Sequence, residues 1–161
     1  MKNLDEKDCK ILNMLQMDCR ASLTNIAKEV DLSVDSVKKR INGLIRNNIF
    51  YSKIQLRPRH FGYSNVVDVK IKLQNNTEEK VSEFIDYLVE NPRVVEIFQI
   101  AGEWDLSIVI ISKDALDLGK TTSQIRDKFG YLINSWNESL TLDCFKFEKY
   151  DMFKLYENRD G

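Results

Sequence analysis

Hydroxyl and cationic side chains gather in one short stretch of the sequence. The stretch contains Ser33, Ser36, Lys38, Lys39 and Arg40, and it is followed further along the chain by Lys53 and Arg57. Cationic groups neutralise phosphates and hydroxyl groups bond to base edges, so these residue types suit a surface that binds duplex DNA. Residues 1–60 hold 12 Lys and Arg against 7 Asp and Glu, whereas residues 61–161 hold 12 against 18. This charge asymmetry indicates that the N-terminal part of the chain meets a polyanion.

Three short helices are expected to position this stretch within residues 1–50. Asp5, either Ser22 or Thr24, and Ser33 are residues of the types that cap helix N-termini. Apolar residues recur at helical spacing after each cap, at Ile11, Leu12 and Leu15, then at Leu23, Ile26, Ala27 and Val30, then at Val37, Ile41, Leu44 and Ile45. Two helices joined by a tight turn, the second with a polar outer face, predict a winged-helix-like helix-turn-helix domain, whose second helix fits the major groove. The alternative is a three-helix bundle used only for packing.

Asp35, near the start of the third helix, points to a further alternative. Its carboxylate repels phosphates, and Ser36 is the only neutral side chain beside it that suits base contacts. A ligand-sensing or assembly protein of the same fold that does not bind DNA would fit this feature. Lys38, Lys39 and Arg40 still make the helix surface basic, which favours DNA binding.

Residues 51–64 are expected to link two domains. The stretch from Ile49 to Leu56 alternates loosely between apolar and polar residues, which predicts a strand that leaves the helical domain. Arg57-Pro58-Arg59 ends this strand, because proline cannot donate to a strand ladder. The cationic residues along it either contact phosphates or form a charged edge that protects against aggregation.

Residues 65–161 have a different hydrophobic period. The predicted elements are a strand over residues 66–73, a helix opened by Thr77-Glu78-Glu79, strands over 94–100 and 104–111, a helix over 114–132 and a strand over 138–149. The order βαββαβ predicts an α+β domain of ferredoxin-like type, with two helices on one face of an antiparallel sheet. The other face needs cover, which a homodimer packed sheet to sheet through Val, Ile and Phe side chains would supply.

Several motifs follow one another in a fixed order along nearly the whole chain. They are Leu4-Asp5-Glu6-Lys7-Asp8-(x2)-Ile11-Leu12, Asp18-x-Arg20, Leu23-(x3)-Ala27-(x4)-Leu32-Ser33, Val37-(x2)-Arg40-Ile41-(x2)-Leu44 and Gly102-Glu103-Trp104-Asp105. Together they resemble the leucine-responsive/asparagine-regulator (Lrp/AsnC) family. The resemblance implies a sequence-specific transcription regulator that binds double-stranded DNA as a homodimer, with tetramers or octamers left open. It also implies an amino acid or related metabolite as effector, bound between subunits.

The loop at 101–105 carries the implied effector site. Gly102 can adopt a positive φ that brings backbone N–H groups to a ligand carboxylate, and Asp105 can bond an ammonium group. Trp104, which stands where the family has Tyr, would line one side of the effector pocket. The carboxylate of Glu103 favours a basic or neutral amino acid over an acidic one. The alternative is a tight hairpin turn in which Gly and Asp serve only the backbone.

Two further effector residues, Ser139 and Thr141, come from the resemblance alone. Ser135-Trp136-(x2)-Ser139-x-Thr141 matches the family's Gly-Val-x-x-Thr-x-Thr loosely. The missing glycine and the bulky Trp136 imply a narrowed or closed pocket. Cys19 is another departure, since the family usually has glycine there.

The sequence offers little support for an enzyme. His60 is the only histidine, so no Ser/His/Asp or Cys/His catalytic set can form without it. The sirohaem decarboxylases share this architecture and carry a His-Asn-Tyr-x-Arg motif, but residues 96–100 contain neither His nor Arg. No cofactor and no metal site are expected.

The compartment is expected to be the cytoplasm. Cys9, Cys19 and Cys144 are odd in number and lack metal-ligand spacing, which suits reduced thiols that are buried or half-buried. No apolar run approaches the roughly 20 residues that span a bilayer, so no membrane contact is expected.

Overall fold

The computed structural model describes residues 4–159, and the chain divides into two compact units. One unit contains the residues up to Gln55 together with those from Phe145 onward, and the other contains Leu56–Cys144. The expected division placed every residue after 65 in the second domain. The difference lies at the C-terminal end, which belongs to the helical unit.

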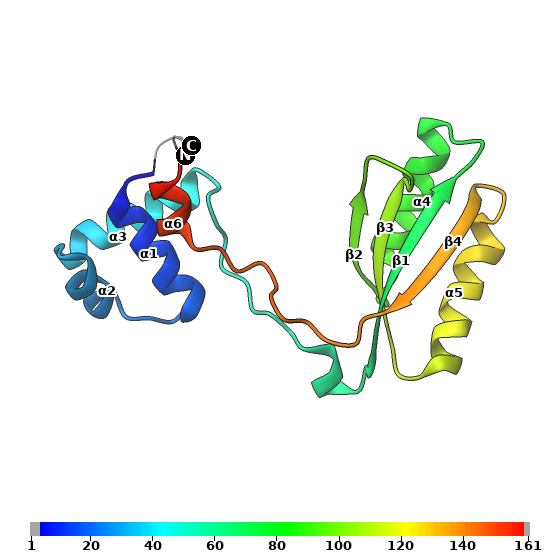
Figure 1. Ribbon diagram of the computed structural model, residues 1–161, viewed down its shortest axis with the longest axis horizontal. Coiled ribbons are helices and arrows are strands. Elements are labelled where there is room, and N and C mark those ends of the chain that lie inside the picture. Colours follow the sequence, from blue (N-terminus) through cyan, green and yellow to red (C-terminus); the bar gives the residue numbers. More distant parts are fainter. Residues whose placement is uncertain (1–3, 160–161) are drawn as a thin grey trace. The chain divides into compact units, whose positions relative to one another are not determined.

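The helical unit contains the three expected helices, α1 (Glu6–Met17), α2 (Leu23–Val30) and α3 (Val34–Arg46) (Figure 1). Asp5, Ser22 and Ser33 cap them, each by accepting a hydrogen bond from a backbone N–H in the first turn. Asp31 ends α2 in the left-handed conformation, which permits the tight turn into α3. The expected apolar stripes meet in one core, built from Ile11, Ile26, Ala27, Val30 and Val37.

A fourth helix, α6 (Met152–Glu157), packs against α1 in this unit. The Asn13 amide binds the N-terminus of α6, because its oxygen accepts the Met152 N–H at 2.8 Å and its nitrogen donates to Asp151 at 3.1 Å. Gln16 forms two hydrogen bonds of 2.9 Å with the backbone of Tyr150. Residues 150–157 are therefore part of the helical unit's fold.

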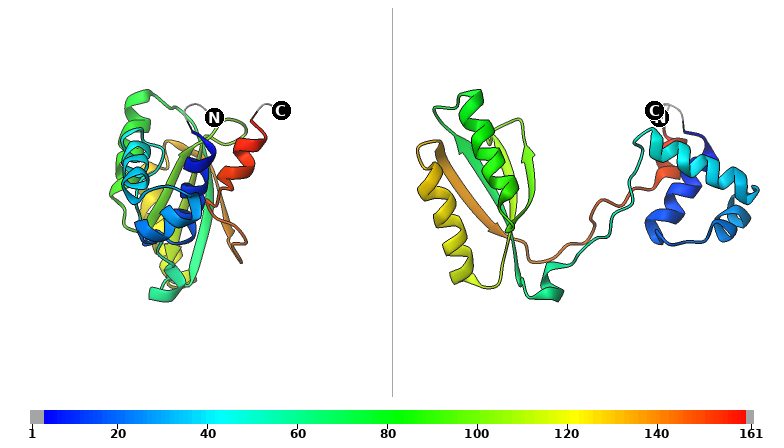
Figure 2. Two further views of the ribbon diagram at one scale, coloured as in Figure 1. Left: turned by 90° about the vertical axis from the view of Figure 1, so that its left-hand side faces the viewer. Right: turned by 180° about the vertical axis from the view of Figure 1, so that it is seen from behind.

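The second unit follows the predicted order βαββαβ. Its elements are η1 (Pro58–Phe61), β1 (Asn65–Leu73), α4 (Glu78–Glu90), β2 (Val94–Gln99), β3 (Leu106–Ser112), α5 (Ala115–Phe129) and β4 (Ile133–Leu140). The strands form one antiparallel sheet in the order β2-β3-β1-β4, which is the ferredoxin-like arrangement. Both helices lie on the same face of this sheet (Figure 2).

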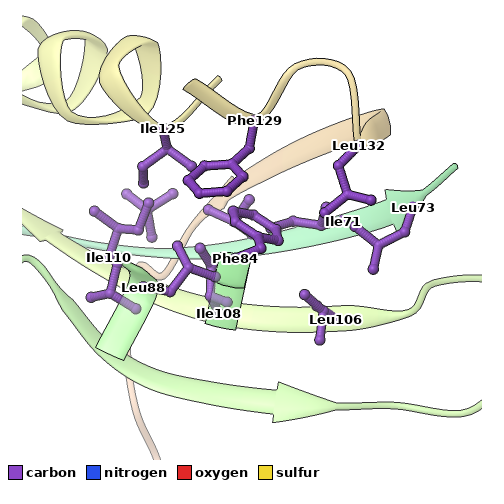
Figure 3. Close-up of a cluster of buried hydrophobic side chains, with 13 residues drawn as sticks. Ile71, Leu73, Phe84, Leu88, Leu106, Ile108, Ile110, Ile125, Phe129 and Leu132 are labelled. Carbon is purple, nitrogen blue, oxygen red and sulfur yellow. The ribbon is translucent and has the colours of Figure 1, made fainter. Parts of the chain in front are cut away.

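The core of this unit lies between that face and the two helices. Phe84 of α4 and Phe129 of α5 are both buried, with ring centroids 4.8 Å apart. They pack over alternate residues of β1 and β3, including Ile71 and Ile108 (Figure 3). Such burial of large apolar side chains is the main source of stability for a sheet covered on one face.

The opposite face of the sheet carries the other half of each strand. By strand register it contains Val66, Asp68, Lys70 and Lys72 of β1, Glu96 and Phe98 of β2, Ser107, Val109 and Ile111 of β3, and Ser135, Asn137 and Ser139 of β4. This face is about two-thirds polar, since eight of these twelve residues are polar or charged, whereas the sequence predicted an apolar one. Its charged residues are paired within the chain, as Lys70 contacts Asp68 at 3.1 Å and Ser107 at 2.7 Å.

Two predicted strands are wrong, and both errors have the same physical reason. Residues 49–56 form no strand, because no neighbouring strand offers them hydrogen bonds. The last strand ends at Leu140, not at 149, because its partner β1 begins at Asn65; the last contact is the Thr141 N–H with the Val66 carbonyl. A segment in which apolar and polar residues alternate therefore forms no strand where no neighbouring strand lies beside it.

The cysteines differ from one another in exposure. Cys9 is buried as expected, but Cys19 and Cys144 are exposed, and all three are free thiols. Burial, with the carboxylates of Asp8 and Asp5 nearby, raises the pKa of the Cys9 thiol. None of the helices within residues 4–159 is long and apolar enough to cross a membrane.

Candidate functional site

The two serines of the predicted DNA surface are engaged at the start of α3. Ser33 is the N-cap, and its Oγ accepts the Ser36 N–H at 3.2 Å. The Oγ atoms of Ser33 and Ser36 lie 2.8 Å apart in a hydrogen bond of their own. Both hydroxyls therefore serve the helix terminus, which leaves them fewer free hydrogen-bonding positions for a ligand.

The Arg40 side chain is half-buried and contacts α1. Its guanidinium nitrogen Nη1 lies 2.8 Å from a carboxylate oxygen of Asp5 and 2.8 Å from one of Asp8. Partial burial acts to raise the pKa of Asp5, but hydrogen bonds from the Asp8 amide and Arg40, with the Arg40 charge, hold that pKa below its ordinary value of 3.8. The arrangement fixes α3 against the N-terminus of α1, so Arg40 acts as a brace within the unit.

The remaining predicted cations are exposed. Lys38 and Lys39 lie on the outside of α3, and neither forms a hydrogen bond or ion pair within the described part of the chain. Lys53 lies 4.4 Å from the centre of the Tyr51 ring, and Arg57 precedes η1 in the second unit. Lys38 and Lys39 are thus the predicted cations that α3 itself presents to solvent.

The outer face of α3 also contains residues that the sequence analysis did not assign to the site. Asn42 and Arg46 are exposed at helical spacing from Lys39, and Asp35 lies one turn before it. The signal that could have found them is the helical period itself, taken with the buried positions Val37 and Leu44 on the opposite side.

The loop between β2 and β3 has the predicted backbone geometry. Gly102 has φ of 133°, and the loop closes through the Ile100 N–H, which donates to the Asp105 carbonyl at 3.0 Å. Glu103 is exposed and Trp104 is half-buried. The Asp105 carboxylate is occupied, since it accepts the Leu73 N–H at 2.7 Å and an ion pair from Lys72 at 3.2 Å. Asp105 therefore has a structural role at the end of β1.

Ser139 and Thr141 lie toward the other end of β1. Ser139 is paired with Asp68, and Thr141 bonds the carbonyl of Val66, whereas Asp105 contacts Leu73. A single chain therefore does not bring these two residues to the 101–105 loop.

A separate cavity of about 460 Å³ lies between α5 and β4. It is lined by Ser123, Arg126, Asp127, Gly130, Ile133, Asn134 and Trp136. Trp136 was expected to narrow the effector pocket, and its Nε1 donates to Glu138 at 2.6 Å. None of the six predicted effector residues lines this cavity.

Residues 4–45 match the family model described as an AsnC-type helix-turn-helix domain, and residues 66–131 match the Lrp/AsnC ligand binding domain. The DNA-binding transcriptional activator DecR of Escherichia coli is 34% identical over 103 residues, which cover 63% of this chain and 68% of DecR. The chain belongs to the Lrp/AsnC family. An HTH-type transcriptional regulator of Methanocaldococcus jannaschii is 32% identical over 120 residues, which cover 73% of this chain and 78% of that protein.

The fold of this Lrp/AsnC protein also matches solved structures. A transcriptional regulator of Neisseria meningitidis, solved as a complex with L-Met, superposes with a TM-score of 0.81 at 19% identity. The match covers 90% of this chain and 94% of that one. The named relatives of the family are transcriptional regulators, so the predicted family, fold class and regulator function are confirmed.

No metal-binding cluster accompanies these features in the described part of the chain. Residues 4–159 contain no group of three or more His, Cys, Asp or Glu side chains that could hold a metal ion. His60 lies exposed in η1.

Proposed function

We propose that this Lrp/AsnC regulator binds duplex DNA as a homodimer through the outer face of α3. The proposal rests on the ion pairs of Arg40 with Asp5 and Asp8, which hold α3 against α1. Lys38 and Lys39 remain exposed on the same helix. A recognition helix must be held rigidly while its outer face stays free, because base contacts depend on position and phosphate contacts on charge. Lys53 and Arg57 are secondary phosphate contacts in this proposal.

The homodimer forms in this proposal through the sheet face that α4 and α5 leave uncovered. The ion pairs of Lys70 with Asp68 and of Lys72 with Asp105 satisfy charges within one chain. Burying an unpaired charge is the main cost of burying a polar surface. A face whose charges are already paired within one chain can be buried without that cost. Phe98 and Val109 supply apolar contact area on the same face.

Replacing both Lys38 and Lys39 by Ala should weaken binding to any duplex and flatten its salt dependence. Each neutralised phosphate contributes about 0.9 to the slope of log K against log salt, so the slope should fall by about 2 per subunit. Titration of random duplex at several salt concentrations measures this slope. Lys120→Ala and Lys128→Ala in α5 form the matched control, which should leave it unchanged. An unchanged slope in the folded Lys38/Lys39 variant would place the DNA surface elsewhere.

An amino acid is the proposed effector, bound at the 101–105 loop where two subunits meet. The positive φ of Gly102 exposes backbone N–H groups to a carboxylate, and the exposed carboxylate of Glu103 is available to a cationic group. Ser139 and Thr141 would come from the second subunit, since one chain holds them apart from the loop. The L-Met complex of the related structure supports amino acids as the ligand class.

Lysine or arginine should raise the thermal unfolding temperature of the protein, and Glu103→Gln should remove this effect. A ligand at 100 times its Kd adds about 2.7 kcal/mol, which is about 10 °C for a domain of this size. Thermal-shift measurements with each amino acid test this, and Glu90→Gln on α4 is the control. If no amino acid shifts the parent at millimolar concentration, the effector proposal is wrong.

The two alternative functions lead to different outcomes. An enzyme of the sirohaem-decarboxylase type is not proposed, because residues 96–100 supply no histidine or arginine and the one histidine lies in η1. A sensor that has lost DNA binding would give no salt-dependent duplex binding at all. That result would favour the sensor over the regulator proposed here.

A further inference from the structure

The outer face of α3 carries one row of polar side chains. Asp35, Lys39, Asn42 and Arg46 follow one another at spacings of four, three and four residues, which places them on one side of a helix. All four are exposed, and none forms a side-chain hydrogen bond or ion pair with another residue in the described part of the chain. Val37 and Leu44 are buried on the opposite side. The row is therefore the part of α3 that is free to contact a ligand.

We infer that Asp35 and Asn42 read base edges in the major groove, Asp35 selecting cytosine and Asn42 selecting adenine. A carboxylate accepts a hydrogen bond from the N4 amino group of cytosine, and a carboxamide bonds both N6 and N7 of adenine. The inference rests on the proposed binding of DNA through α3, and it adds the bases that α3 prefers.

The distance between the two residues sets the spacing of the two bases. Seven residues of helix span about 10 Å, and base pairs are stacked about 3.4 Å apart. Asp35 and Asn42 can thus reach bases about three pairs apart within one half-site. Arg46, a further turn along, lies toward the phosphate backbone.

Phosphate binding does not explain Asp35. A carboxylate one turn before the cations of α3 weakens attraction to the DNA backbone, so it lowers the affinity for every sequence alike. A role confined to the helix is the competing explanation, because an acid in the first turn interacts favourably with the helix dipole. The properties of an Asp35 variant distinguish the helix role from the base-reading role. Loss of the helix role lowers stability, whereas loss of the base-reading role changes the preferred sequence.

The brace at Arg40 bears on this inference because it fixes the rotation of α3 about its own axis. Arg40 is on the inner side of the helix and contacts two carboxylates of the α1 terminus at 2.8 Å. A helix held in this way presents the same row to every operator, which base-specific hydrogen bonds require.

Selection of binding sequences from a random duplex library, with the full chain, tests the inference. The parent should select half-sites that contain cytosine and adenine about three base pairs apart. Asp35→Asn should lose the preference at the cytosine position and Asn42→Ala the preference at the adenine position, each by about tenfold. Glu29→Gln and Asn25→Ala are matched controls on the neighbouring α2, both exposed. They should leave the selected sequence unchanged.

The outcomes separate this inference from the proposed function. If the two variants select the same sequence as the parent, the base assignment is overturned while DNA binding through α3 stands. A lower unfolding temperature for Asp35→Asn with an unchanged sequence preference would assign Asp35 to the helix alone. A parent that binds no duplex would overturn the proposed function and this inference with it.

Discussion

Replacing Arg40 by Ala should destabilise the helical unit by about 2 kcal/mol while leaving the salt slope of DNA binding unchanged. The side chain of Asp8 is only 12% exposed, so its carboxylate would lose its cationic partner in a poorly solvated place. For a domain of this size the loss corresponds to about 10 °C in unfolding temperature. Hydrogen exchange of the amides in α1 and α3 measures the change within the unit that contains the brace.

Arg46→Ala is the matched control for this prediction. Arg46 is exposed on the same helix and has no ion pair in the described residues, so its loss should change stability little. Arg40 would instead be a phosphate contact if Arg40→Ala lowered the salt slope by about 1 and left the exchange rates unaltered.

The contribution of the brace should also depend on pH. The pKa of Asp5 is lower in the folded protein than its ordinary value of 3.8, so the stability from this group is fully present above that value. It is lost as the pH falls through the folded pKa and the carboxylate takes up a proton. The difference in stability between the parent and Arg40→Ala should therefore shrink below about pH 4. A difference that stays constant to pH 2 would contradict the assignment.

The second large effect is expected from Phe98→Asp, which should dissociate the proposed dimer. The Phe98 side chain is 51% exposed in the single chain and lies on the face that the helices leave uncovered. An aromatic side chain at an interface often contributes 2 kcal/mol or more, and a buried unpaired carboxylate adds a further cost. The dimer should weaken by about 100-fold or more, and operator affinity should fall with it, because two half-sites are no longer bound together.

Sedimentation velocity at micromolar concentration measures the dimer, and Leu116→Asp is its control. Leu116 is 71% exposed on α5, on the helical side of the unit, so the same change there should leave the dimer intact. A dimer that survives Phe98→Asp and dissociates with Leu116→Asp would place the interface on the helices.

Features of the fold that depend on neighbouring residues in the sequence could be predicted. Ser33 and the other cap residues are recognisable because the hydrogen bond they accept comes from within three residues. The inward positions of α2 and of β1 follow from the helical and strand periods. The order of elements then restricts the topology to the ferredoxin-like one.

Features that depend on a distant partner could not be predicted in the same way. From the sequence Arg40 fits either the DNA surface or a charge pair across a domain interface, and only the approach of α1 shows that it binds Asp5 and Asp8. Asp105 looks like a ligand residue until Leu73 is seen to donate to it. Where a strand ends is also decided by its neighbour, as β4 ends where β1 begins.

The place of α6 in the helical unit has a consequence for the order in which the protein matures. The chain is synthesised from α1 through the whole sheet unit before residues 145–159 appear, and domains generally fold as their residues leave the ribosome. Asn13 and Gln16 therefore have no α6 to bind during synthesis of the sheet unit. The helical unit, although it begins first in the sequence, is therefore completed only after the sheet unit has been synthesised.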